Sequence, residues 1–411
     1  MTELWTMPNG LRVVAEKLPW LRSVSVGVWL HVGSLWEKPE ENGLSHLIEH
    51  MVFKGTENRT TRQIAEETDA MGGQVNAFTA RDCTCFYAKV IDEELPEAVS
   101  LLSDLVLHAR MDPGELERER GVVLEEIAMD EDDPEDLCGE LLNQAQFGDT
   151  PAGRHIIGTA ELVRAYTDAD LRRFRDTHYV PSRAVIALSG NYDRKQVEDL
   201  IGTYFGAWRG DDPQAAVGPQ TVRGGVRSLR EKDTEQTHLM LGYPGYVYGD
   251  DRNMALTILN TIFGGAMSSR LFQRIREELG MAYSVYTFPG SLEGIGTFGI
   301  YAGVNPRNAE RVLAEIHRGR EALIADGVTE KEFREAKRQL RTGFLMSLES
   351  QGARMNAMGR RLLILNKTRT EEEVLASIEA VTREDVCETA RQLLTADPCL
   401  AAVGRGVEAL G

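Results

Sequence analysis

The sequence predicts an α+β protein of two tandem, structurally similar domains, each an antiparallel-rich β-sheet covered by helices. A run of strands followed by a run of helices appears twice along the chain. Two segments near the end of the first half, which begin at residues 167 and 185, correspond to segments that begin at 382 and 400. Both pairs are separated by 215 positions, which favours duplication of one unit.

A stretch without apolar periodicity separates the halves. Residues 211–225 contain aspartate, glycine and proline, a composition that is typical of a linker. We therefore predict one domain at residues 1–210, a linker at 211–225 and a second domain at 226–411.

Periodicity predicts the elements of the first half in order. Strands are expected where β-branched and aromatic residues run or alternate, at 13–16, 24–32, 74–79, 84–90 and 184–189. Helices are expected at 43–53, at 61–71 before a Gly-Gly pair, throughout 94–175, and at 195–208.

The second half repeats this order of elements. Strands are expected at 238–242, 283–288, 296–302 and 400–403, and helices at 253–263, 269–279 and throughout 306–365. Each half therefore supplies enough strands for a sheet and enough helices to cover it.

Composition narrows the classes of function. Of the 411 residues, 42% are hydrophobic and 27% are charged, as in folded globular proteins. No run approaches the roughly 18–20 apolar residues that span a membrane, and the formal net charge of −18 disfavours nucleic acid and anionic membranes as partners. Without a secretory signal, and with five cysteines in no paired CxxC spacing, we expect a cytoplasmic protein with free thiols.

The strongest motif is His46-Leu47-Ile48-Glu49-His50, inside a predicted helix. His46 and His50 are four residues apart, so both imidazoles leave the same helix face, which suits two positions around one zinc ion. Glu49 also lies on that face, where a carboxylate can take a proton from water activated by a metal. Ordinary hydrogen-bonded core histidines are the alternative.

The order His-x-x-Glu-His inverts the His-Glu-x-x-His motif of zinc peptidases. In this motif the chain resembles the pitrilysin/insulysin family of metallopeptidases, and the resemblance extends from residues 9–13 through both halves. Within the family, it resembles the bacterial branch that is similar to mitochondrial processing peptidases. The resemblance implies a metalloprocessing-peptidase-like fold, one zinc ion per chain, His46 and His50 as metal ligands, and Glu49 as general base.

The family's third zinc ligand is a glutamate on a later helix. Residues 119–127 match that element, and Glu126 is the position that the resemblance assigns. Glu125 points about 100° away around the helix. Glu119, two turns earlier on the face of Glu126, matches the family's second acidic residue, which orients a ligand or the water. A solvated acidic helix face is the alternative for this run of charges.

The second half lacks the metal motif. When the two halves are aligned by the repeat, the three polar residues of the motif correspond to Thr257, Asn260 and Thr261. The second half therefore cannot bind zinc in the same way. It resembles instead the family's second-half motif, an arginine followed seven residues later by a tyrosine, here Arg276 and Tyr283. The resemblance implies that the arginine binds a peptide carbonyl or carboxylate and that the tyrosine donates to the oxyanion. A surface charge and a half-buried strand aromatic are the alternatives.

Two further segments are expected to bind the substrate. Residues 74–79 resemble the strand that borders the catalytic groove in this family, where an extended peptide adds by backbone hydrogen bonds; the residues assigned here are Asn76, Ala77 and Phe78. Asp136 and Glu140 match two acidic residues that bind an arginine near the cleavage site in processing peptidases. An acidic helix N-terminus, favoured by the helix dipole, explains them equally well.

We therefore expect a zinc endopeptidase that cuts extended peptides or unfolded segments and prefers basic residues near the cleavage site. One alternative is a non-catalytic or scaffold subunit of a heterodimeric peptidase, although that predicts eroded ligands. The other is a zinc lyase of the quorum-signal type, although such chains are shorter and undoubled.

The resemblance also concerns assembly. Single-chain clamshells of the family hold four such units and this chain has two. A homodimer, or a heterodimer with a paralogous subunit, is therefore expected.

Overall fold

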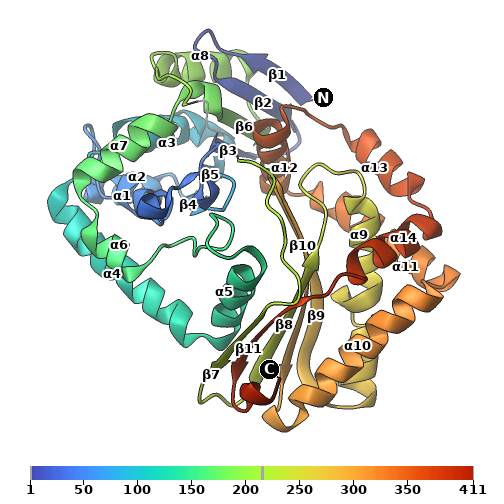
Figure 1. Cartoon of the computed structure of the whole chain (residues 1–411). Coiled ribbons are helices and arrows are strands. Elements are labelled where there is room, and N and C mark those ends of the chain that lie inside the picture. The colour runs from blue at the N-terminus through green and yellow to red at the C-terminus, as the bar shows by residue number, and fades with distance from the viewer. Residues whose placement is uncertain (1, 214–216, 411) are drawn as a thin grey trace. The chain divides into compact units, whose positions relative to one another are not determined.

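The computed structural model describes residues 2–213 and 217–410 and contains two mixed β-sheets (Figure 1). The part of the predicted linker at residues 214–216 lies outside the described residues. Helices and sheets form two units, as the α+β prediction requires.

The first sheet has six strands in the order β1-β2-β6-β3-β5-β4. Within it, β2 and β6 are parallel and the other neighbours are antiparallel. The predicted strands are present, and β1 is an additional edge strand that periodicity did not predict. The strands are β1 (Thr2–Thr6), β2 (Arg12–Lys17), β3 (Ser23–Leu30), β4 (Gln74–Thr79), β5 (Thr84–Ile91) and β6 (Ala184–Gly190).

The second sheet has five strands in the order β7-β11-β8-β10-β9. Its first pair is parallel and the others are antiparallel, so it repeats the first sheet without β1. Thr167 and Thr382, which are 215 positions apart, each close a capping box at the start of a helix. This agreement confirms the predicted pair of similar domains. The strands are β7 (Arg227–Glu231), β8 (Thr237–Pro244), β9 (Ala282–Leu292), β10 (Ile295–Val304) and β11 (Cys399–Gly404).

Helices occupy most of the segments between the strands. In the first half they are α1 (Leu44–Val52), α2 (Thr61–Ala70), α3 (Leu95–His108), α4 (Pro113–Asp132), α5 (Pro134–Phe147), α6 (Ala160–Ala165), α7 (Asp168–His178) and α8 (Arg194–Phe205). In the second half they are α9 (Asn253–Asn260), α10 (Ala309–Asp326), α11 (Glu330–Ser347), α12 (Gln351–Leu365), α13 (Glu371–Ala380) and α14 (Arg383–Leu394). The segments Thr261–Gly265 and Phe272–Glu278 are π-helical.

The two compact units exchange a helix each. One unit comprises Met1–Ile127, His155–Ala216 and Leu345–Thr370, and the other comprises Ala128–Arg154, Val217–Phe344 and Glu371–Gly411. Helix α5 thus belongs to the second unit, where it packs on β8 and β11, and α12 belongs to the first, where it packs on β3 and β6. The units therefore differ from the contiguous domains expected at 1–210 and 226–411, because each sheet is covered on one face by a helix from the other half.

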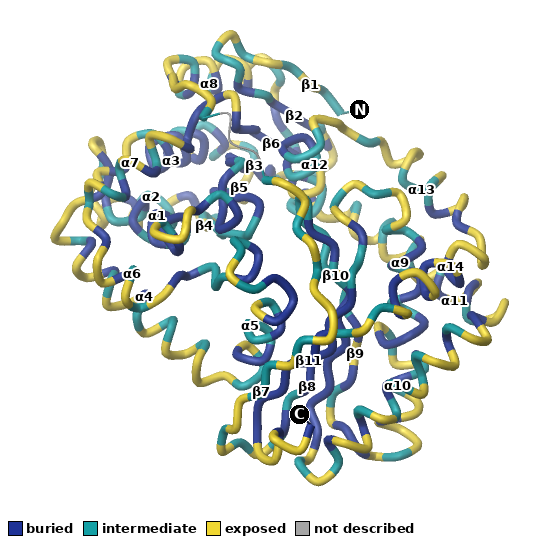
Figure 2. Tube along the Cα trace, in the orientation of Figure 1, coloured by how far each residue is buried: buried dark blue, intermediate teal, exposed yellow. Residues whose placement is uncertain are grey.

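Apolar burial explains why each sheet needs helices on both faces. The side chains of the central strands are buried on both sides, and these strands are dark blue in Figure 2. In the first unit, Trp29 packs with Met355 and Leu362 of α12. In the second unit, Leu142 of α5 packs with Met240 of β8. Removing this area from water is the main favourable term that holds the helices to the sheets.

Two expectations from composition can be compared with the structure. Among the described residues, no helix is both long and apolar enough to cross a lipid bilayer. All five cysteines are buried, and none of them forms a disulfide bond.

The contact between α12 and the first sheet predicts the effect of a single methyl group. A Cβ at Gly359 would lie 2.4 Å from Trp29 Nε1, and Trp29 is buried, so either the indole or the helix must move. We expect Gly359→Ala to lower the free energy of unfolding by about 1–3 kcal/mol, measured from thermal or urea unfolding of the whole chain. Gly343→Ala in α11 is the control, because a Cβ there meets no atom within 4 Å and should stabilise by up to about 1 kcal/mol. Equal stability of the two variants would contradict the proposed packing.

Candidate metal centre

The motif helix α1 is short, and its packing separates an apolar face from a polar one. Its apolar side chains are buried in the core of the first unit: Leu44, Leu47, Ile48, Met51 and Val52. His46, Glu49 and His50 are only partly buried. The sequence period of 3.6 thus produces a helix held by one face, with the three polar side chains of the motif on another.

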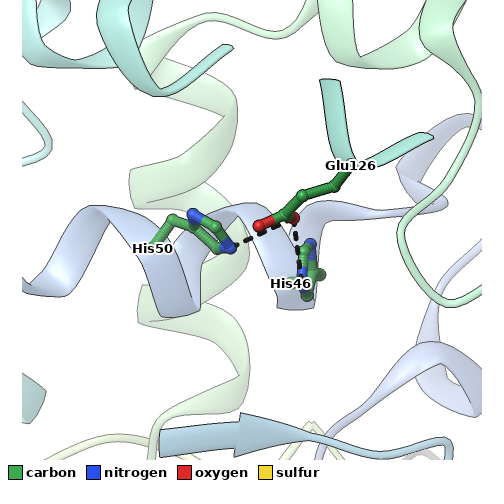
Figure 3. Close-up of side chains that lie close together, drawn as sticks. All are labelled: His46, His50 and Glu126. Atoms are coloured by element: carbon green, nitrogen blue, oxygen red, sulfur yellow. Dashed lines mark ion pairs between the residues drawn. The ribbon is translucent and has the colours of Figure 1, made fainter. Parts of the chain in front are cut away.

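His46, His50 and Glu126 point toward one another (Figure 3). Glu126 Oε2 lies 3.8 Å from His46 Nε2 and 3.5 Å from His50 Nε2, and one ligand atom from each residue falls within 4.8 Å of the others. These separations are long for hydrogen bonds. Ligands at zinc-binding distance in a tetrahedral site lie about 3.3 Å apart. The donor set and its spacing therefore fit a single zinc ion.

The protonation state of His46 also fits a metal ligand. Burial lowers the pKa of His46 to about 4, with further lowering from His50 and His155. Its imidazole is therefore neutral at pH 7, as a metal ligand must be. On α4, Glu126 faces the histidines while its neighbour Glu125 is exposed, as the helical offset of the two residues predicts.

Glu119 lies beside His50. Its carboxylate Oε2 is 3.3 Å from His50 Nδ1, and the residue is buried, with 6% exposed. Lys54 Nζ lies 2.8 Å from the other carboxylate oxygen, Oε1. A carboxylate bonded to the far nitrogen of an imidazole fixes the orientation of the ring. Sequence reasoning missed Lys54, although its position four residues after His50 was a usable signal.

Glu49 has a partner that sequence reasoning also missed. Thr79 is the last residue of β4, and its Oγ1 donates a hydrogen bond to Glu49 Oε2 at 2.6 Å. Burial raises the pKa of Glu49, partly offset by this hydrogen bond and by His50. The signal was the alternation of β4, because Thr79 lies on the strand face of Val75 and Ala77, which pack toward the α1 core.

The expected substrate strand β4 is an edge of the first sheet. Ala77 lies on the face of Thr79, which suits the role expected for this segment. Asn76 and Phe78 alternate to the other face, where the Phe78 ring lies 5.6 Å from that of Trp29. The side chains of Asn76 and Phe78 therefore do not face α1.

The remaining expected site residues lie in the second unit. Arg276 is in a π-helical segment, a form that often marks functional sites. Its guanidinium carbon lies 5.7 Å from the ring centre of Tyr283, which is on the edge strand β9 and 73% exposed. Asp136 and Glu140 are one turn apart on α5.

Among the described residues of the second unit, no group of His, Cys, Asp and Glu side chains has the spacing of the metal group. Asn260, which occupies the place of Glu49 in the repeat, accepts a hydrogen bond through its Oδ1 from Thr287 Oγ1 of β9 at 2.7 Å. The second unit thus has a hydrogen bond between α9 and β9 but lacks the candidate metal ligands.

Comparisons with known proteins find relatives over nearly the whole chain. The family model "Insulinase (Peptidase family M16)" matches residues 12–160, and "Peptidase M16 inactive domain" matches residues 165–340. The protein named uncharacterized zinc protease YmxG of Bacillus subtilis is 40% identical over 98% of both chains. An uncharacterized zinc protease of Mycobacterium tuberculosis is 43% identical over 95% of this chain and 90% of its own.

Solved structures agree in fold. A crystal structure of a protease from Helicobacter pylori superposes with a TM-score of 0.92 at 22% identity, over 98% of this chain and 99% of the other. A Pseudomonas fluorescens structure described as a peptidase M16 inactive domain gives 0.91 at 20% identity, over 99% and 98%. From the sequence identity over nearly its whole length, this chain belongs to the insulinase family of M16 peptidases.

Proposed function

We propose that the chain is a zinc-dependent endopeptidase that hydrolyses extended peptides or unfolded segments. The observation that carries this proposal is the grouping of His46, His50 and Glu126 at zinc-ligand spacing, with Glu49 on the same helix. A zinc ion held there would polarise the scissile carbonyl and make water more acidic.

The chain's own residues supply the proton transfers and the orientation. Glu49 would accept a proton from the attacking water and return it to the leaving amine, as a general base and then a general acid. Thr79 would hold the Glu49 carboxylate in place, and Glu119 would hold His50.

The second unit would contribute contacts to the peptide. Arg276 and Tyr283 have exposed side chains, so both are available to a substrate. In the proposed roles, Arg276 binds a carbonyl or carboxylate and the Tyr283 hydroxyl donates to the oxyanion of the tetrahedral intermediate. An intact metal group argues against a purely scaffolding subunit, which needs no such spacing.

We also propose that Asp136 and Glu140 select basic residues near the scissile bond. They are four residues apart on α5, so both carboxylates project from the same side of this helix, and Asp136 is exposed. Two carboxylates one turn apart attract a guanidinium more strongly than one does.

The central prediction concerns Glu49. We expect Glu49→Gln to retain stoichiometric zinc but to lose about 10²–10⁴-fold in kcat, the usual contribution of a general base. Zinc content and cleavage of a quenched peptide are the measurements. Glu125→Gln is the matched control, because this exposed glutamate is adjacent to the proposed ligand Glu126. Full activity of Glu49→Gln would exclude the proposed mechanism.

Thr79 provides a second, independent test of the geometry. Thr79→Val keeps the shape of the side chain but removes the hydroxyl that donates to Glu49. We expect kcat to fall about tenfold with unchanged zinc affinity, because Thr79 contacts the base and no proposed ligand. Thr79→Ser retains the hydroxyl and should keep most of the activity. Equal kcat for the valine and serine variants would show that the hydrogen bond has no role.

The proposed specificity can be tested by charge reversal. We expect Asp136→Lys with Glu140→Lys to lower kcat/KM for an arginine-containing peptide about tenfold relative to the same peptide with citrulline, because attraction becomes repulsion. Glu371→Lys with Glu372→Lys is the control, since it reverses two acidic residues in the first turn of another helix. An unchanged arginine-to-citrulline ratio would remove the specificity proposal and leave the peptidase proposal intact.

A further inference from the structure

Glu37 is a buried carboxylate directed at the start of the motif helix. The residue is 2% exposed and follows a short 3₁₀ turn, Ser34–Trp36. Its Oε2 accepts hydrogen bonds from the backbone N–H of Gly43 at 2.8 Å and from Asn42 Nδ2 at 3.2 Å. Its Oε1 accepts from the backbone N–H of Ser45 at 2.8 Å. One carboxylate therefore binds two backbone N–H groups at the start of α1, those of Gly43 and Ser45.

The first turn of α1 cannot cap itself. Its N-cap residue is Gly43, which has no side chain and has φ of +97°, in the left-handed region. The first N–H groups of a helix lack partners within the helix, so they need an acceptor from elsewhere. Glu37 supplies that acceptor, and its negative charge is favourable at a helix N-terminus.

Neighbouring contacts hold the same turn from the other side. A Cβ at Gly43 would lie 2.7 Å from Ile157 O, so the two backbones are in close contact. Asn42 Nδ2 also donates to His155 O at 2.9 Å, and the Tyr166 hydroxyl donates to Asn42 O at 2.8 Å. Glu37 thus belongs to a set of contacts that surround the residues preceding His46.

The two histidines are held in different ways. His50 has its Nδ1 beside Glu119, which can orient the ring directly. His46 Nδ1 is buried, and no hydrogen bond to it is found among the described residues. The orientation of His46 therefore comes from packing and from the position of its backbone. Ser45, the residue before it, donates its backbone N–H to Glu37.

Other helices of this unit are capped locally and at lower cost. Asp193 caps α8 and Thr60 caps α2 from the N-cap position itself. Glu37 acts from six residues before Gly43, and burial raises its pKa, which reflects the cost of desolvating the carboxylate. A local cap would serve stability alone, whereas a buried bidentate acceptor also fixes the position of the turn.

We propose that Glu37 is a positioning residue for the metal centre: it fixes the first turn of α1 and so holds His46 in ligand geometry. This inference rests on the proposed function, since it assumes that His46 binds zinc. Glu37 itself touches neither substrate nor metal.

Glu37→Gln is the informative variant, because it keeps the size of the side chain. An amide has only one acceptor oxygen, so one of the two backbone N–H groups would face an NH₂ group and lose its partner. Asp193→Asn is the matched control, because it makes the same chemical change at another helix start in the same unit.

The experiment uses the full chain and three measurements. These are the zinc Kd from competition with a chromophoric chelator, the visible absorption spectrum of the Co²⁺-substituted protein, and the thermal unfolding midpoint without metal. We expect Glu37→Gln to weaken zinc binding about tenfold or more and to change the Co²⁺ bands. Asp193→Asn keeps the one acceptor oxygen that caps α8, so it should change the midpoint little and leave the zinc Kd and the Co²⁺ spectrum as in the original chain.

Each outcome decides between the proposals. An unchanged zinc Kd and Co²⁺ spectrum in Glu37→Gln would overturn this inference, even if the midpoint fell, because Glu37 would then be only a structural cap. If Glu37→Gln does not fold, Glu37→Asp provides the same test, since its carboxylate is one methylene short of the turn. If the original chain binds no zinc, the proposed function itself fails.

Discussion

Burying a helix that carries two imidazoles and a carboxylate costs free energy unless each polar group meets a partner. The apolar face of α1 packs in the core, which fixes the rotation of the helix about its axis and therefore the direction of its polar side chains. Glu119, Thr79 and Glu37 then bind His50, Glu49 and the helix start respectively. These partners come from helix α4, from strand β4 and from the loop just before α1, and together they surround the helix that carries His46 and His50.

Duplication explains how one scaffold can carry a candidate metal centre in only one unit. Apart from β1, both sheets share one strand order and sense, so the second unit repeats the sheet of the first without the candidate metal ligands. The hydrogen bond between Thr287 and Asn260 resembles the one between Thr79 and Glu49. A strand hydroxyl that binds this helix is therefore a structural feature of the repeat, and the carboxylate in the first unit adds chemistry to it.

Sequence patterns predicted most of the strands and helices because their signals are local. The resemblance assigned Glu126, and the angle between successive residues of a helix implied that Glu125 would point elsewhere. Glu125 is exposed in the structure. The edge strands β1 and β7 were missed because short edge strands carry weak alternation. The exchange of α5 and α12 was missed because an apolar helix face does not specify which sheet it will cover.

The sequence by itself determined that His46, Glu49 and His50 share one helix face, because spacing along a helix sets direction. It also determined the repeat, because one pattern of periods occurs twice. Only the tertiary structure decided that Lys54, Thr79 and Glu37 are the partners of the site. The reason is physical: which side chains meet across α1, α4 and β4 depends on sheet register and helix packing, and no periodicity within a single segment contains that information.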